Sequence, residues 1–308
     1  MFRLIALAMF LAFAMPCEWG SSATAFAASA AEPLRVVVTL PVLKDWVQQI
    51  GGSYVHVNSL MTGYESEHTY SPKPSDLVAV RKAALLFEVG AGLEVWVASL
   101  VKNAGNGSLR VVTTSKDIEL IQDHPEPAGT SHSHEHAAGN PHVWLDPAAA
   151  ATMVQHISDA MAAADPAHAT DYRTNTATYL QALTRVQDES LARLRSLPSR
   201  AIIVHHPAWP YFARRYDLHI AGTIPTQPGG EPSARHLHTL IETIKRDHVR
   251  VIISEVQLNQ KVPQLLARET GARIAVLTTL PGGVPGTETY LDMLRYNVLQ
   301  LAQALEQT

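Results

Sequence analysis

The stretch Ala167–Leu194, AHATDYRTNTATYLQALTRVQDESLARL, contains neither glycine nor proline. Its apolar side chains recur at spacings of three, four and five residues: Tyr179, Leu180, Leu183, Val186, Leu191 and Leu194. An apolar stripe with this period predicts one uninterrupted helix. At 1.5 Å per residue, such a helix is about 40 Å long, which is enough to run along two lobes as a rigid connector.

The segment before this helix alternates predicted strands and helices. Leu34–Leu40 (LRVVVTL) is a continuous apolar, β-branched run, as expected for a strand that is buried on both faces. A helix over Leu43–Ile50 follows, with Gly51 and Gly52 as its stop signal. Further strands are predicted at Val55–Met61, Ala84–Val89 and Leu109–Val112, and a helix at Ser75–Arg81 with Ser75 as its N-cap.

The segment after the long helix repeats this pattern. Strands are predicted at Ala201–Val204, His219–Thr223, Val249–Ser254 and Arg273–Leu277, and helices at Ala208–Tyr216, Ser233–Arg246, Val262–Thr270 and Thr289–Glu306. Alternating strands and helices favour parallel sheets covered by helices. We therefore expect an α/β fold of two parallel-sheet α/β lobes joined by one long backbone helix. The expected boundaries are 31–165 for the N-terminal lobe, 166–197 for the connecting helix and 198–308 for the C-terminal lobe.

Residues 1–30 have the pattern of a secretory signal peptide. Arg3 precedes the apolar run Leu4–Met15, which is too short to span a bilayer. Small residues then form A-x-A cleavage sites at Ala25–Ala27 and Ala28–Ala30. The residue before Cys17 is a proline, which argues against lipid anchoring at that cysteine. Cleavage at either site leaves a periplasmic chain without cysteine, which excludes thiolate zinc sites and disulfides.

Charge and hydropathy argue against two kinds of partner. The formal net charge is −4 and no basic cluster occurs, which argues against nucleic acid. No later apolar run approaches the roughly 18 residues that a transmembrane helix needs, so we expect no membrane span in the mature chain.

Histidines occur in three widely spaced motifs. His68 lies in SEHTYSPKPSD (66–76), His142 in NPHVWLDP (140–147), and His205 and His206 in VHHPAWPYF (204–212). Ligands of open α/β sheets bind outside the carboxyl ends of the strands, so these motifs are expected to face one crevice. Imidazole is the commonest protein ligand for zinc, and convergence of these histidines would create a metal site that depends on the fold.

Together with the closing stretch TETYLDMLRYNVLQLAQAL (287–305), these motifs resemble the metal-binding proteins of bacterial zinc and manganese ABC importers. The resemblance runs from about residue 34 to the C-terminus. It implies two lobes on one backbone helix, and binding and delivery of a metal ion without catalysis. The implied partners are an ABC permease and its ATPase subunit, and the implied ligands are His68, His142 and His206.

Two questions about the ligands remain open. Adjacent side chains at a strand end point in opposite directions, so one of His205 and His206 is expected to bind the metal. The resemblance favours His206, because of its place before the following helix. Many relatives supply a later carboxylate where this chain has Thr278, a poor zinc ligand. Glu67 or water is expected to complete the tetrahedron. Glu255 is a weaker candidate, expected to accept a hydrogen bond from behind a ligand.

The ligand types favour Zn²⁺ as the cargo. Three imidazoles with at most one carboxylate suit zinc, whereas Mn²⁺, the alternative, prefers oxygen-rich octahedral sites. A second histidine cluster, His132, His134 and His136, lies in the Gly/Pro/Ser-rich segment 124–137. We expect it to form an auxiliary loop outside the primary site, either capturing zinc loosely or serving only as a linker.

Two further functions compete with import. A periplasmic zinc chaperone or buffer would use the same site without a permease. A catalytic zinc hydrolase would also need three protein ligands and an open position, but the chain has no H-E-x-x-H motif. We expect a monomer without enzymatic activity. Asp76 and Asp146 are expected to cap turns or helices, and Arg214 and Arg215 to be solvated.

Overall fold

The structure is a computed structural model that describes residues 32–65, 67, 70–122, 139–197, 199–225 and 232–306. The predicted signal peptide with Cys17, the predicted ligand His68 and the auxiliary histidines His132, His134 and His136 lie outside these residues. Pro33–Thr308 form one compact unit. Within the described ranges, no helix combines the length and the apolar character needed to cross a membrane.

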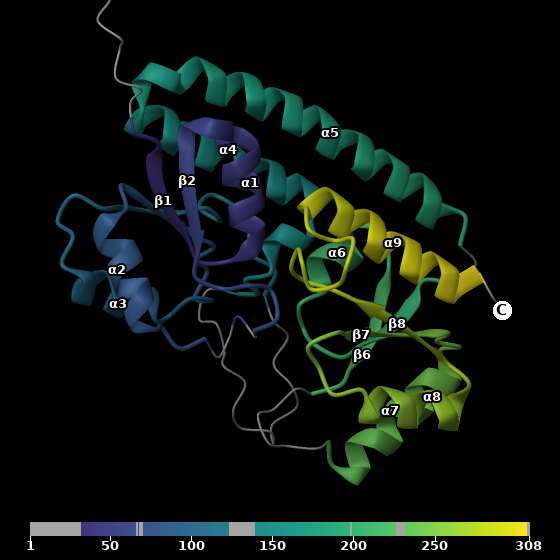
Figure 1. Ribbon diagram of the computed structural model, residues 1–308. Coiled ribbons are helices and arrows are strands. Elements are labelled where there is room, and N and C mark those ends of the chain that lie inside the picture. The colour runs from purple at the N-terminus through teal and green to yellow at the C-terminus, as the bar shows by residue number, and fades with distance from the viewer. Residues whose placement is uncertain are drawn as a thin grey trace, which may run out of the picture. The chain divides into compact units, whose positions relative to one another are not determined.

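The first sheet has four parallel strands in the order β2-β1-β3-β4 (Figure 1). Its central strands β1 and β3 carry runs of buried apolar residues, as expected when helices cover both faces. The strands are β1 (Leu34–Val38), β2 (Val55–Ser59), β3 (Leu85–Glu88) and β4 (Arg110–Thr113). The accompanying helices are α1 (Pro41–Gly51), α2 (Pro74–Lys82), α3 (Val97–Ala104) and α4 (Pro147–Ala164). We call residues 32–165 the first half.

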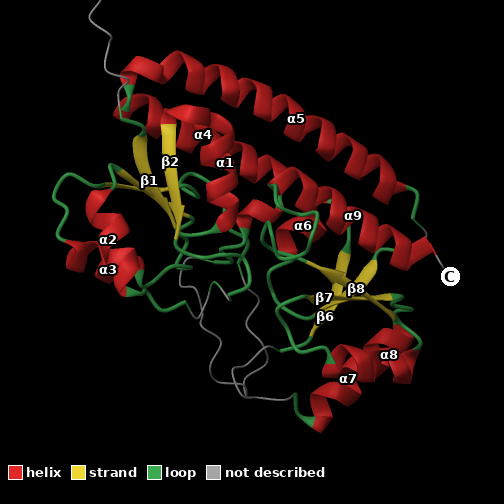
Figure 2. Ribbon diagram, in the orientation of Figure 1, coloured by secondary structure: helices red, strands yellow, loops and turns green. Residues whose placement is uncertain are grey.

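The second sheet repeats this topology, with four parallel strands in the order β6-β5-β7-β8. Figure 2 shows its strands with helices on either side. The strands are β5 (Ala201–Val204), β6 (His219–Thr223), β7 (Val251–Glu255) and β8 (Arg273–Leu277). The helices are α6 (Pro210–Arg215), α7 (Ala234–Arg246), α8 (Lys261–Thr270) and α9 (Tyr290–Glu306). We call residues 199–306 the second half.

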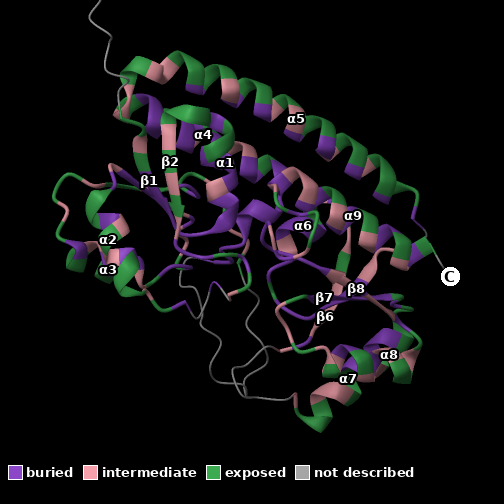
Figure 3. Cartoon of the chain, viewed as in Figure 1, coloured by how far each residue is buried: buried purple, intermediate pink, exposed green. Residues whose placement is uncertain are grey.

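The long helix α5 (Ala169–Arg195) joins the two halves. It packs against α1 and α4 of the first half and against α9 of the second half. In Figure 3 its inner face carries buried residues and its outer face exposed ones. The predicted fold class, two parallel-sheet α/β lobes on one backbone helix, is confirmed. The exact lobe boundaries stay a prediction.

Several local predictions were wrong. Helix α2 begins at Pro74, and its N-cap is Lys73, so Ser75 lies inside the first turn. The side chain that caps this helix is Asp76, whose Oδ2 accepts a hydrogen bond from Lys73 N at 2.7 Å. Helices α3 and α4 were not predicted. In α4 an alanine-rich run gives a weak amphipathic pattern although alanine favours helix strongly.

Polar contacts tie the two halves together. Arg215 of α6 forms a two-point ion pair with the buried Asp146, at 2.6 and 2.9 Å, so the prediction that Arg215 is merely solvated was wrong. Asp146 also caps α4, as predicted. Trp144 Nε1 donates to Thr279 O at 2.7 Å, and Tyr290 Oη donates to Trp144 O at 2.5 Å. Residues of the second half therefore fix the position of the segment directly after His142.

Candidate metal centre

The predicted motifs lie where strands end. Glu67 is in the loop after β2, His206 lies two residues after β5, and Glu255 is the last residue of β7. His142 directly precedes a short 3-10 turn, Val143–Leu145, that leads into α4. As expected for parallel sheets, most of the candidate side chains lie at the carboxyl ends of the strands.

Three of these side chains converge. One ligand atom from each of Glu67, His142 and His206 lies within 4.8 Å of the other two. Glu67 Oε1 is 3.4 Å from His142 Nε2, and the two imidazole rings lie 5.0 Å apart at 87°. All three are buried, with exposed fractions of 5 %, 1 % and 8 %. Burial shows that Glu67 is not a solvated loop carboxylate.

The donor set fits a zinc ion. Zinc accepts imidazole nitrogen and carboxylate oxygen at about 2.0–2.2 Å, and two ligands of such a tetrahedron lie about 3.4 Å apart. The Glu67–His142 separation already has this value. Glu67 Oε1 is buried and has no hydrogen-bond partner among the residues that the structure describes. A buried carboxylate oxygen is costly without a partner, and a cation between the three groups would supply one.

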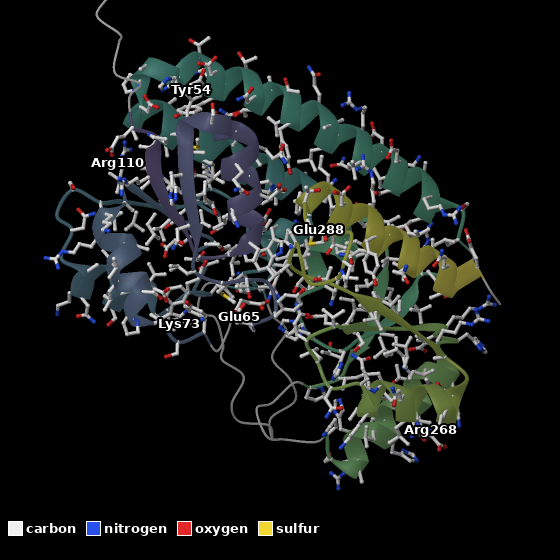
Figure 4. All side chains as sticks on the ribbon, in the orientation of Figure 1. Tyr54, Glu65, Lys73, Arg110, Arg268 and Glu288 are labelled. Carbon is white, nitrogen blue, oxygen red and sulfur yellow. The ribbon has the colours of Figure 1, made fainter. Side chains whose placement is uncertain are left out.

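The loop that carries Glu67 is anchored on both sides. Glu65, labelled in Figure 4, accepts hydrogen bonds from Thr62 N at 2.8 Å and Thr62 Oγ1 at 2.7 Å. On the other side, Tyr70 Oη donates to Asp76 Oδ2 at 2.6 Å. Burial and the Asp76 carboxylate raise the pKa of Tyr70, which keeps the phenol protonated as a donor. Glu67 thus lies in the chain between two fixed points.

The His142 ring is oriented by an amide. Its Nδ1 lies 2.9 Å from Asn140 Oδ1, and the same oxygen accepts the His142 backbone N–H at 3.1 Å. An amide oxygen can only accept, so Nδ1 carries the proton in the neutral ring. Nε2, on the side that faces Glu67, is then the nitrogen that could coordinate an ion.

The His206 ring is oriented by a carboxylate. Its Nδ1 lies 3.1 Å from Glu255 Oε1, and Trp209 Nε1 donates to the same oxygen at 2.9 Å. Burial lowers the pKa of His206, but the carboxylates of Glu255 and Glu67 outweigh it and raise the pKa overall. Glu255 therefore lies where an acceptor was expected from the sequence, behind the ring of the candidate ligand His206.

His205 faces a different partner. Its Nδ1 lies 2.9 Å from Ser254 Oγ, and burial lowers its pKa. The cluster with Glu67 and His142 includes His206, which favours His206 as the ligand. At the position of the missing carboxylate, Thr278 Oγ1 donates to Leu280 O at 2.7 Å and so closes its own loop. Within the described ranges, no other three His, Cys, Asp or Glu side chains gather in this way.

Asn140 and Ser254 were not predicted as functional residues. Asn140 stands two residues before His142, in a motif that the sequence had already singled out. This closeness in sequence was a detectable signal, because a metal-bound histidine needs an acceptor for its second nitrogen and an asparagine can supply one. Ser254 gave no such signal, since only strand pairing brings β7 beside the end of β5.

Comparisons with known proteins agree with this geometry. A family model described as zinc-uptake complex component A, periplasmic (ZnuA), matches residues 36–304. A putative metal-binding protein of Treponema pallidum is 30% identical over 278 residues, covering 89% of this chain and 87% of the relative. The zinc-binding protein AdcA of Streptococcus pyogenes is 27% identical over 281 residues. That match covers 86% of this chain but only 55% of AdcA, so the chain spans about half of that relative.

Solved structures share the fold. A crystal structure of ZnuA superposes with a TM-score of 0.77 at 29% identity, covering 88% of this chain and 99% of that one. A zinc-bound deletion mutant of ZnuA gives a TM-score of 0.76 at 29% identity, covering 90% of this chain and 100% of that one.

Proposed function

The chain belongs to the family of periplasmic zinc-uptake components, and we propose that it binds one zinc ion between Glu67, His142 and His206. The observation that carries the proposal is the convergence of these three buried side chains from both halves of the molecule. The neighbouring His68 is proposed as a further ligand because of the motif it occupies.

Binding without catalysis is the proposed mechanism. The Nε2 atoms of His142 and His206 and a carboxylate oxygen of Glu67 take the ion as cargo. The carboxylates of Glu67 and Glu255 offset the charge of the ion inside a buried site, where an unpaired cation would be costly. With His68, the set has three imidazoles and one carboxylate, which suits zinc better than manganese, since manganese prefers more oxygen ligands.

Delivery to an ABC permease with its ATPase subunit is proposed from the family. A periplasmic location is proposed from the same family. Removal of residues 1–30 is proposed from the sequence pattern alone, and a monomeric carrier is proposed as well. The lobe boundaries at 165/166 and 197/198 belong to this proposal. His132, His134 and His136 are proposed as an auxiliary loop, so deletion of residues 124–137 should leave the zinc affinity of the primary site unchanged in a competition titration.

Metal titration of the mature protein tests the proposed site. Calorimetry with Zn²⁺ and Mn²⁺ should give tight 1:1 binding of zinc and weaker binding of manganese. His142→Ala and His206→Ala should each weaken zinc binding by more than about 100-fold, since even outer partners of ligands contribute about 10–100-fold. His238→Ala, on the exposed face of α7, is the matched control. Wild-type zinc affinity in both His142→Ala and His206→Ala would refute the assignment.

A further inference from the structure

Asn140 makes contacts that its place in the sequence does not explain. It is 1 % exposed, and its side chain is used at both ends. The Oδ1 atom receives the His142 backbone N–H and lies 2.9 Å from His142 Nδ1. The Nδ2 atom donates to Pro207 O at 2.6 Å. Pro207 directly follows His206 in the chain, so one amide contacts one ligand ring and the backbone beside the other ligand.

The two ends of this amide belong to different halves of the molecule. His142 precedes α4 in the first half, and His206 and Pro207 follow β5 in the second half. The rings of His142 and His206 lie 5.0 Å apart at 87°, and Asn140 contacts the first ring and the carbonyl of the residue after the second. The backbone of Asn140 is fixed as well, because its O accepts from Tyr211 Oη at 2.7 Å and its N donates to Ile121 O at 2.8 Å.

We propose that Asn140 is a positioning residue that sets the separation of the two imidazole ligands across the junction of the halves. The inference rests on the proposed zinc function of that site. Tetrahedral zinc requires ligand atoms about 3.4 Å apart, and a change of a few tenths of an ångström distorts the site. Asn140 fixes the orientation of one ligand and the backbone position of the other, so it links orientation to spacing.

The chemistry of the side chain supports this role. The position needs an acceptor for His142 and a donor for the Pro207 carbonyl at the same time, and an amide supplies both. An aspartate would keep the acceptor but would place a second carboxylate oxygen against the Pro207 oxygen, 2.6 Å away in the present geometry. An alanine would remove both contacts. These two substitutions therefore separate the orientation of His142 from the distance between the ligands.

Another contact between the halves provides the matched control. Arg215 binds Asp146 across the same junction, but neither residue is among the hydrogen-bond partners described here for His142 or His206. If Asn140 acted only by holding the halves together, Arg215→Gln would produce the same changes at the metal. If Asn140 positions the ligands, only its own variants will do so.

The experiment compares Asn140→Ala, Asn140→Asp, Arg215→Gln and His206→Ala with the wild-type mature protein. Zinc affinity is measured by chelator competition, zinc release by stopped flow, and ligand geometry by the visible spectrum of the Co²⁺-loaded protein. Asn140→Ala should weaken zinc binding about 10–100-fold and alter the Co²⁺ spectrum. Asn140→Asp should release zinc about tenfold faster, because repulsion from Pro207 O separates the ligands. Arg215→Gln should lower the melting temperature and leave the spectrum unchanged.

The outcomes distinguish a failure of the positioning role of Asn140 from a failure of the proposed zinc-binding function. A wild-type spectrum and affinity in Asn140→Ala, or wild-type release in Asn140→Asp, would overturn the positioning role while zinc binding stands. The same spectral change in Arg215→Gln would also overturn it. Failure of the wild-type protein to bind zinc, or full affinity in His206→Ala, would instead refute the proposed function. If Asn140→Ala does not fold, the release rate of Asn140→Asp decides the question.

Discussion

The two sheets have the same topology, and each buries a glutamate where its central strands end. In the first half, Glu94 follows β3 and contacts Thr39, the residue directly after β1. In the second half, Glu255 ends β7 and contacts His206, which follows β5. The exposed fractions are 5 % for Glu94 and 4 % for Glu255, so burial does not distinguish the two.

The partners of the two glutamates distinguish them. Glu94 accepts from Thr39 Oγ1 at 2.7 Å and from the backbone N–H groups of Val89 and Gly90 at 2.8 and 2.9 Å. These donors hold the turn after β3, and none of them is an imidazole that could bind a metal. The donors to Glu255 are an indole and an imidazole, and the imidazole has a second nitrogen for a metal. In this pair of glutamates, the partner therefore distinguishes the carboxylate beside a candidate metal site from the one that only holds a turn.

The largest predicted effect is on the pH dependence of the free energy of unfolding, and it should come from Glu94. Burial raises the pKa of Glu94 to about 7, from 4.5, against the effect of its three donors. Between these values the folded protein holds one proton more than the unfolded chain, so the free energy of unfolding falls as pH rises from about 4.5 to 7. The slope approaches about 1.4 kcal/mol per pH unit.

Denaturant unfolding of the metal-free protein across this range measures the effect. Glu94→Gln carries no titrating proton, so its stability should depend less steeply on pH than that of the wild type. Its zinc affinity should remain unchanged. Parallel pH profiles for the two proteins would show that Glu94 is ionised throughout, and that its hydrogen bonds outweigh its burial.

Removal of Glu255 should instead weaken zinc binding. Glu255→Ala leaves His206 Nδ1 and Trp209 Nε1 without their common acceptor. Zinc affinity should fall about 10–100-fold, equivalent to about 1.4–2.8 kcal/mol. Chelator competition measures this, with Glu94→Gln as the matched buried carboxylate. Equal zinc affinity in these two variants would remove the distinction between the two glutamates.

The sequence predicted the fold well because the fold follows from patterns along the chain. The glycine-free run at Ala167–Leu194 predicted the connecting helix, and the β-branched strand cores predicted the two sheets. The resemblance of the chain to the metal-binding proteins of zinc and manganese importers is also confirmed. The end of β2 was predicted two residues too late, at Met61, because apolar character continues past the last paired residue, Ser59. Strand ends depend on pairing, which the sequence of one strand does not contain.

The site was predictable only in part. His142, His206 and Glu67 stand in recognisable motifs, and these ligand assignments stay predictions until metal binding is measured. The contacts behind the rings were predicted only in part, since Glu255 was expected as an acceptor and Asn140 was not. Asn140 reaches Pro207 across 67 residues, and Glu255 reaches His206 across 49. The first pair arises from the packing of the two halves and the second from the pairing of β5 with β7, and the periodicity of a single element contains no information about either contact.

The smallest effect in this comparison should come from Thr39. Thr39→Val keeps the shape of the side chain and removes the hydroxyl that donates to Glu94 Oε1, while the two backbone donors to Glu94 remain. The free energy of unfolding should fall by about 1 kcal/mol, the usual net contribution of one buried hydrogen bond, with zinc affinity unchanged.

Ser254→Ala is the counterpart in the second half, because it removes the partner of His205 Nδ1. It should cost a similar amount of stability and leave zinc affinity unchanged, since His206 is oriented by Glu255. Measured together by denaturant unfolding and zinc competition, the pair tests whether contacts at strand ends affect the metal only through a ligand ring. A loss of zinc affinity in Thr39→Val would show that the first sheet is coupled to the site and that the two glutamates are not independent.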